Sequence, residues 1–127
     1  MAFFGPEDVE KLLAPGVDDA VLLRLYTAHT ADANRQLRKW LGSRAEEEEA
    51  DPSMETRNAG ALLVLYYGLP VMNMRLTSRG GLVTATGFDQ ARQELMSAGQ
   101  LQQTRNMLYR QARRLVQDGA EVGLWAL

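Results

Sequence analysis

The chain has 127 residues, of which 46% are hydrophobic and 24% are charged, and this size and composition predict one ordinary globular domain with a single core. It contains no cysteine, which excludes disulfides, thiolate metal ligands and a cysteine nucleophile. The formal net charge of −2 argues against a freestanding nucleic-acid binder.

The first third of the chain predicts two helices. Pro6 opens a short helix that reaches Ala14. The N-terminus of the sequence has no basic region followed by a long apolar run, so no signal peptide is expected. Asp18 caps the second helix and Gly42 closes it. The apolar stripe of this helix recurs in steps of three and four residues: Leu22, Leu25, Tyr26, His29, Ala33, Leu37, Trp40 and Leu41. His29 is the only histidine, and a place on that stripe favours a structural role in a core or an interface.

A polar connection, residues 43–50, comes next and contains the four glutamates Glu46 to Glu49. Because these like charges repel one another, we expect a solvated loop or a frayed helix start. A metal site is not expected, since adjacent side chains on a helix point in different directions. Asp51 and Pro52 then predict the cap and the first residue of a central helix.

The central segment, Asn58 to Met74, is seventeen residues long and carries no charge. It is shorter than the roughly 20 apolar residues that span a bilayer, and it contains Gly68 and Pro70, so we predict a buried core helix with no membrane span. Pro70 has no amide hydrogen, which predicts a kink near Gly68. We expect the chain to continue helically over residues 71–78. The predicted buried stripe is Leu62, Leu63, Tyr66, Leu69, Met72 and Leu76.

The last third predicts an extended loop and one long helix. Residues 80–87 are rich in glycine and β-favouring side chains, which indicates a short strand or an extended loop, but they lack the lysine of a phosphate-binding loop. Residues 89–118 contain no proline and predict a helix of about 45 Å, ended by Gly119. Its seam is interrupted only by Arg105, and it comprises Ala91, Leu95, Ala98, Leu101, Leu108, Ala112 and Leu115.

No catalytic constellation emerges from this pattern, so the chain is predicted to be a non-enzyme without a cofactor. The candidate partner-binding residues are Arg110, Arg113, Arg114, Leu124, Trp125 and Leu127. The arginines suit the negative end of a helix, and they equally suit an acidic partner or a phosphate backbone. Residues 119–127 form a tail that either folds back onto the bundle or docks into a neighbouring protein.

The two halves of the chain carry opposite charge. Residues 1–58 hold twelve acids and seven bases, whereas residues 59–127 hold four acids and seven bases. This distribution suits a protein that contacts copies of itself or two different neighbours, and it is equally compatible with charges scattered over a solvated surface.

Several segments together resemble the helical head–tail connector proteins of tailed bacteriophages. They are the opening PEDVEKLL followed by a helix start at Val17-Asp18-Asp19, the central RNAGALLVLYYGLPVMNMR, the loop SRGGLVTATG and the final QTRNMLYRQARRLV. The resemblance covers most of the chain. The Leu69-Pro70 interruption departs from the family's central helix.

The resemblance implies a single all-α domain over residues 1–127, with about four helices, the last of them long. It also implies a virion protein in the neck between capsid and tail that is made in the host cytoplasm. Such proteins form rings, commonly dodecamers, beneath the portal, extend the DNA channel without recognising a DNA sequence, and dock a stopper or tail protein.

Two rival functions remain open. A small helical DNA-binding or regulatory protein would use the arginines between Arg105 and Arg114. An enzyme subunit with a ligand near Pro70 has no residue pattern in its favour.

Overall fold

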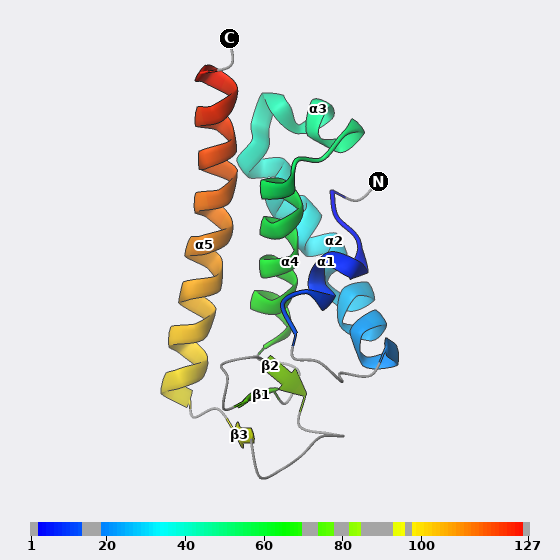
Figure 1. Ribbon diagram of the computed structural model, residues 1–127, viewed down its shortest axis with the longest axis vertical. Coiled ribbons are helices and arrows are strands. Elements are labelled where there is room, and N and C mark those ends of the chain that lie inside the picture. The colour runs from blue at the N-terminus through cyan, green and yellow to red at the C-terminus, as the bar shows by residue number, and fades with distance from the viewer. Residues whose placement is uncertain are drawn as a thin grey trace.

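The computed structural model describes residues 3–13, 19–69, 74–77, 82–84, 93–95 and 98–125, with side chains placed for 3–13, 19–69 and 99–118. The elements in chain order are α1 (Pro6–Glu10), α2 (Asp19–Leu41), the 3-10 turn η1 (Gly42–Arg44), α3 (Ala45–Ala50), α4 (Met54–Gly68), β1 (Met74–Thr77), β2 (Leu82–Thr84), β3 (Gln93–Leu95) and α5 (Ala98–Trp125). The protein is the predicted all-α bundle with a long C-terminal helix, and a small sheet lies at one end (Figure 1).

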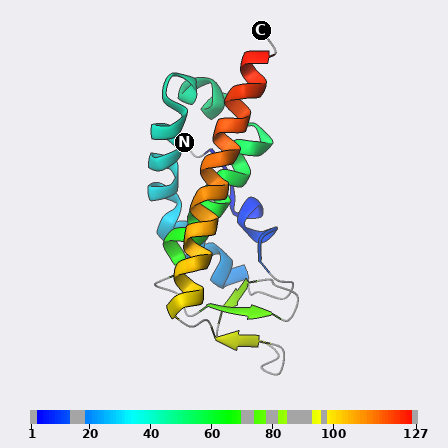
Figure 2. The ribbon, with the colours of Figure 1, turned by 90° about the vertical axis from the view of Figure 1, so that its left-hand side faces the viewer.

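Helix α4 is the centre of the bundle. It lies between α5 on one side and α1 and α2 on the other, and the view from the side of α5 shows α5 in front of it (Figure 2). Every residue from Ala59 to Leu65 is buried, which fits the absence of charge in this segment. Burying one leucine contributes about 1.5–3 kcal/mol, so this helix supplies much of the core. The predicted buried central helix is confirmed.

The start of α4 differs from the prediction by two residues. Ser53, not Asp51, is the N-cap, because its hydroxyl accepts a hydrogen bond from the Thr56 amide at 3.2 Å. The same hydroxyl donates to the Glu48 carboxylate at 2.7 Å, and the Thr56 hydroxyl donates to that oxygen as well. The glutamate-rich segment, predicted as a loop or frayed start, is the short helix α3, and Glu48 joins it to α4.

The end of α4 agrees with the predicted break, but the next segment differs from the prediction. The helix stops at Gly68, and the helical continuation expected over 71–78 is wrong, because residues 74–77 form strand β1. β1 is the middle strand of an antiparallel sheet with the order β2-β1-β3. Arg75 pairs with Val83 on one side and with Leu95 on the other. Leu76 therefore belongs to a strand rather than to a helical stripe, and Met72 lies outside the described residues.

The sheet also shortens the start of the predicted long helix. Residues 93–95 form β3, so α5 begins at Ala98 instead of Asp89, and Leu95 is not part of a helical seam. β2 lies within the loop predicted as extended. At the other end Gly119 does not terminate the helix, which continues to Trp125.

The stripe predicted for α2 is confirmed. Five of its members are buried, and Tyr26 and Trp40 pack against the core from partly exposed positions. His29 is half-buried near Gly68, and its imidazole makes no hydrogen bond within the described part of the chain. Gly42 adopts a φ of 57°, a left-handed conformation typical of a helix C-terminus, which agrees with its predicted role. Asp18 lies outside the described residues. The first helix ends at Glu10 rather than Ala14.

The N-terminal segment is a core element that the sequence pattern did not predict. Phe3 and Phe4 are buried against the bundle. The Phe3 amide donates to Asn34 Oδ1 at 3.0 Å, and the Tyr26 hydroxyl donates to the Phe4 carbonyl at 3.0 Å. The Phe4 ring lies so close to Gly60 of α4 that a Cβ there would overlap it.

An ion pair between the buried Asp8 and the half-buried Arg57 connects α1 to α4 beside these phenylalanines. Asp8 is 1% exposed, and its Oδ2 accepts hydrogen bonds from the Gly5 amide at 2.9 Å and from Arg57 Nε at 3.3 Å. Its Oδ1 makes no hydrogen bond to any described residue, although Arg57 Nη2 lies 3.1 Å away. Asp8 is therefore more than a favourable charge at a helix start, because it pairs with a residue 49 positions away in sequence.

Candidate functional site

The two sides of α5 differ in character, and the outer one is the candidate site. Leu108, Ala112 and Val116 are buried against the bundle, and Leu101 and Leu115 pack at the edges of that contact. The predicted seam of the helix is confirmed at four described positions: Leu101, Leu108, Ala112 and Leu115. Val116 is also buried, and the prediction missed it. Ala91 and the side chain of Ala98 lie outside the described set.

Arg105, the interruption of the seam, binds α4. Its Nε donates to the Tyr66 carbonyl at 3.1 Å, and its guanidinium stacks 4.3 Å from the centre of the Tyr66 ring. In an uninterrupted helix the amide of residue 70 would donate to this carbonyl, but residue 70 is proline and has no N–H. Arg105 therefore satisfies an orphaned acceptor at the end of α4 and is not available as a surface charge.

Four aromatic side chains hold α2, α4 and α5 together near this point. The ring of Tyr109 lies 5.3 Å from Trp40 and 5.2 Å from Tyr66, and the rings of Tyr66 and Tyr67 are 5.1 Å apart. Burial raises the pKa of the Tyr67 hydroxyl above its ordinary value, because the phenolate would lose hydration. These rings fix the position of α5 relative to the other helices.

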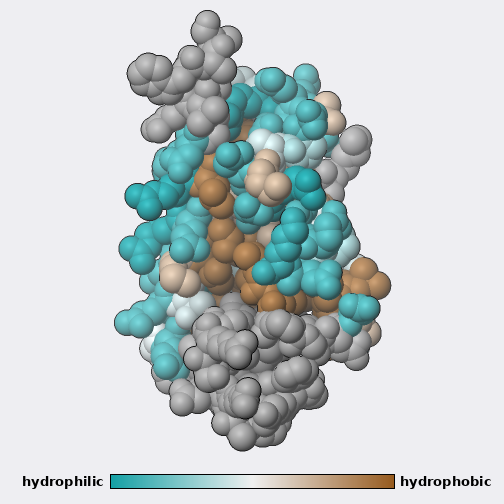
Figure 3. Space-filling model, viewed as in Figure 1, coloured by the Kyte–Doolittle hydropathy of each residue, from teal (hydrophilic) through white to brown (hydrophobic). Residues whose placement is uncertain are grey.

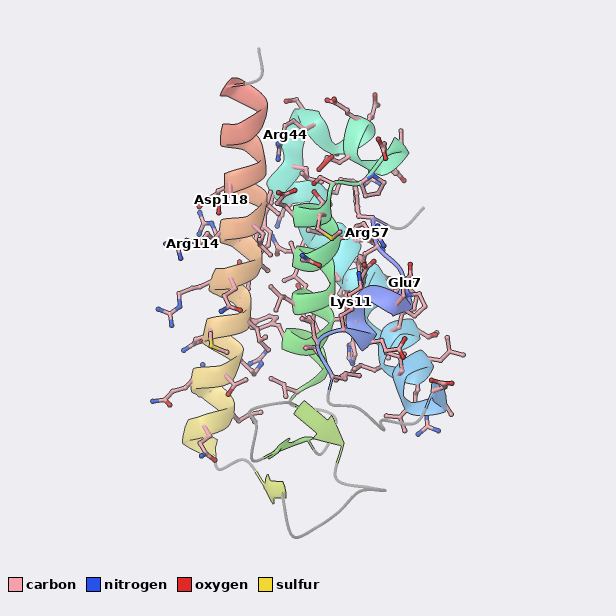
Figure 4. The ribbon with its side chains drawn as sticks, viewed as in Figure 1. Glu7, Lys11, Arg44, Arg57, Arg114 and Asp118 are labelled. Atoms are coloured by element: carbon pink, nitrogen blue, oxygen red, sulfur yellow. The ribbon has the colours of Figure 1, made fainter. Side chains whose placement is uncertain are left out.

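The outer side of α5 carries the three predicted arginines. Arg110, Arg113 and Arg114 are exposed, and none forms an ion pair with any residue in the described parts of the chain. Arg110 Nε donates only to the Asn106 carbonyl of its own helix, at 3.4 Å. Over residues 99–118 the only acid is Asp118, and it projects outward on the same side of the bundle as Arg114 (Figure 4).

A shallow depression among these arginines exposes an apolar side chain. It is lined by Met107, Arg110, Gln111 and Arg114, and the side chain of Met107 is 44% exposed. We call Met107, Arg110, Arg113 and Arg114 the arginine face. In Figure 3 hydrophilic residues cover the outer side of α5, whereas a band of hydrophobic residues follows the line of α4.

A second depression separates Arg113 from the α2–η1 corner. It is lined by residues that include Trp40, Arg44, Arg113 and Gln117. Arg44 crosses toward α5 and donates from Nη2 to the Val116 carbonyl at 3.2 Å. Arg113 thus borders both the outer side of α5 and the corner that Arg44 closes.

Residues of the opposite charge lie on α3, which is on the other side of α4 from α5 (Figure 1). Glu48 bonds to Ser53 and Thr56, and Glu49 pairs with Arg38 at 3.0 Å. The hydrogen bond from Arg38 lowers the pKa of the Glu49 carboxyl. The remaining acids of α3 and its C-cap are exposed and have no ion pair among the described residues: Glu46, Glu47 and Asp51.

The three predicted tail residues are only partly placed. Leu124 and Trp125 belong to the last turn of α5, so they continue a helix instead of forming a separate tail; their side chains and the whole of Leu127 lie outside the described residues. The last turns of α5 extend past the α2–α3 end of the bundle in both ribbon views (Figures 1 and 2).

The described segments offer neither a metal centre nor a membrane span. Within them no group of histidine, aspartate or glutamate side chains is arranged to hold a metal ion. None of the helices in those segments combines the length and hydrophobicity that crossing a membrane requires.

Comparison of the chain with protein-family models, with curated proteins and with solved structures gives no match.

Proposed function

We propose that the protein is a structural head–tail adaptor of a tailed bacteriophage, which forms a ring beneath the portal in the neck of the virion. The sequence resemblance suggests this role, and the helical bundle with its long last helix is compatible with it. The observation that carries the proposal is the outer side of α5, whose exposed arginines have no acidic partner among the described residues of their own subunit.

A ring needs two different contact surfaces on each subunit, because each copy meets one neighbour on either side. The arginine face and the exposed acids of α3 are two such surfaces. The projecting end of α5 supplies a third, through which Leu124 and Trp125, with Leu127 after them in the sequence, would enter the portal, since aromatic anchors often dominate protein interfaces. The DNA would pass through the ring without sequence recognition, and a stopper or tail protein would dock to its free side.

The test is binding to the portal ring encoded by the same viral genome. We expect the purified chain to decorate one end of portal rings in electron micrographs. Trp125→Ala should abolish this binding while the subunit keeps its helical circular dichroism and its melting temperature. A chain that never binds portal rings would refute the adaptor function. A Trp125→Ala chain that loses stability would instead show that the helix end packs on its own subunit.

One observation favours the DNA-binding alternative, and two weigh against it. A shallow depression beside Arg110 is lined by Tyr66, Asn106 and Tyr109, which are side chains able to contact a base. However, the Tyr66 ring is already covered by Arg105, and the Tyr109 ring packs against Trp40. DNA binding predicts a mobility shift of duplex DNA at low salt that disappears as salt is added.

A further inference from the structure

The arginine face of α5 has a specific complement on the same chain. We propose that it binds the exposed acids Glu46, Glu47 and Asp51 in a second copy of the protein, which makes a head-to-tail contact between neighbouring subunits. This inference deepens the proposed function and rests on it for the ring, but the contact itself involves only this chain.

The pattern of paired and unpaired charges favours this contact. Of the other exposed arginines with described side chains, two find acids and one does not: Arg35 lies 3.1 Å from Asp32, Arg38 lies 3.0 Å from Glu49, and Arg24 has no ion pair among the described residues. The arginine face has no such pair, and neither do the exposed acids at α3 within the described segments. The chain therefore presents an unpaired basic surface and an unpaired acidic surface.

The two surfaces cannot satisfy each other within one subunit. Arg114 points away from the bundle on the α5 side (Figure 4), whereas α3 lies on the other side of α4 (Figure 1). Asp118 is the only acid over residues 99–118, and one carboxylate does not balance the charge of three arginines. Pairing thus requires a second molecule.

Each surface also offers an apolar contact. Only three large hydrophobic side chains are exposed among the described residues: Leu23, Met54 and Met107. Met107 belongs to the arginine face, and Met54 follows Asp51 at the start of α4. Methionine is flexible and adapts to irregular partner surfaces. Each side of the contact would therefore combine three charges of one sign with a methionine.

The relation between these surfaces determines the kind of assembly. Because α5 and α3 lie on opposite sides of α4 (Figure 1), one contact engages the basic surface of one copy and the acidic surface of the other, so it is heterologous and closes into a ring or grows into a filament. Exposed ion pairs are weak individually and are screened by salt. The contact should thus set orientation and register, and it should weaken as ionic strength rises.

Charge reversal tests the contact in full-length chains. Variant A carries Arg113→Glu and Arg114→Glu, and variant B carries Glu46→Arg and Glu47→Arg. Sedimentation at low salt and high protein concentration should show that wild type self-associates. The self-association of each variant alone should be weaker than that of wild type by about tenfold or more, because the contact would juxtapose like charges. An equimolar mixture of A and B should recover association, since each then offers the surface that the other lacks.

A matched control keeps the change in net charge constant. Arg24→Glu with Arg35→Glu matches the charge change of variant A and reverses two exposed arginines of α2 outside the proposed contact, of which Arg35 pairs only with Asp32 of its own helix; it should leave association unchanged. The inference is overturned if wild type stays monomeric, if A and B associate like wild type, or if their mixture does not recover. It is also overturned if variant A keeps self-association but loses binding to duplex DNA.

The same variants separate this inference from the adaptor function. If wild type self-associates with the predicted charge dependence but never binds portal rings, the contact stands and the adaptor role fails. If variants A and B both form complete rings on portals, the adaptor role stands and the contact fails.

Discussion

Arg105 of α5 donates a hydrogen bond to the main-chain carbonyl of Tyr66, the last residue but two of α4, at 3.1 Å. The contact joins the long outer helix to the end of the buried one. It also explains why a charged residue interrupts an otherwise apolar seam, because Pro70 leaves that carbonyl without its usual donor.

Removing this donor should destabilise the bundle. Arg105→Met keeps much of the side-chain length but leaves the Tyr66 carbonyl unpaired, so we expect the free energy of unfolding to fall by about 2 kcal/mol. Arg105→Lys should recover part of the loss, because lysine can donate but does not stack as a planar group. Urea denaturation followed by circular dichroism measures both. An Arg105→Met protein as stable as wild type would contradict the assigned role.

Gly60 should be sensitive to the smallest possible enlargement. A Cβ at this position overlaps the Phe4 ring, so Gly60→Ala should cost about 1–3 kcal/mol through overpacking, despite the better helix propensity of alanine. Gly99 of α5 is the matched control, because a Cβ there has no neighbour within 4 Å. Gly99→Ala should stabilise the protein by up to about 1 kcal/mol. Equal effects of the two substitutions in a denaturation experiment would show that Phe4 does not pack on α4.

The start of α4 can be located by two alanine substitutions. Ser53→Ala removes the N-cap hydroxyl, which bonds to Thr56 and Glu48, and should cost about 1 kcal/mol. Asp51→Ala removes the residue that the sequence suggested as the cap and should change stability by less than about 0.5 kcal/mol. Thermal melts of the two proteins give the comparison, and the reverse order of effects would place the cap at Asp51.

The pH dependence of stability should show the partly buried phenol of Tyr67. Its pKa is raised in the folded protein, mainly by burial. Its stabilising contribution is therefore fully present below the pKa of the unfolded chain, near 10, and is lost as pH rises through the higher folded pKa. Tyr67→Phe cannot ionise, so its stability should decline less between about pH 9.5 and 11 than that of wild type. Parallel decline in urea titrations across this range would reject the assignment.

The helices were predictable because their signals are local. In α2 apolar residues recur every three or four positions, and in α4 they form a long uncharged run. Both patterns extend over many consecutive residues, and burial follows from each of them. The three arginines singled out in the sequence, Arg110, Arg113 and Arg114, are exposed on α5, and their role in binding a partner stays a prediction. What the sequence did not reveal is that Arg105 binds α4, because its partner is a carbonyl 39 residues away.

The misplaced elements share a different cause. Met74–Thr77 and Gln93–Leu95 have no strong strand pattern of their own, and they become strands by pairing with each other. Phe3 and Phe4 lie outside any periodic segment, so their burial depends on the space above Gly60, which exists only in the folded bundle. These features depend on contacts between segments distant in sequence, which a single-sequence pattern does not report.

The central position of α4 has a consequence for synthesis on the ribosome. The partners on one of its sides, α1 and α2, emerge first, but the side that meets α5 stays uncovered until residues 108–116 have been made. For that interval the nascent chain exposes hydrophobic surface that no earlier segment is placed to hide. Chains truncated within α5 should therefore aggregate or recruit chaperones, whereas chains that extend past Val116 should not.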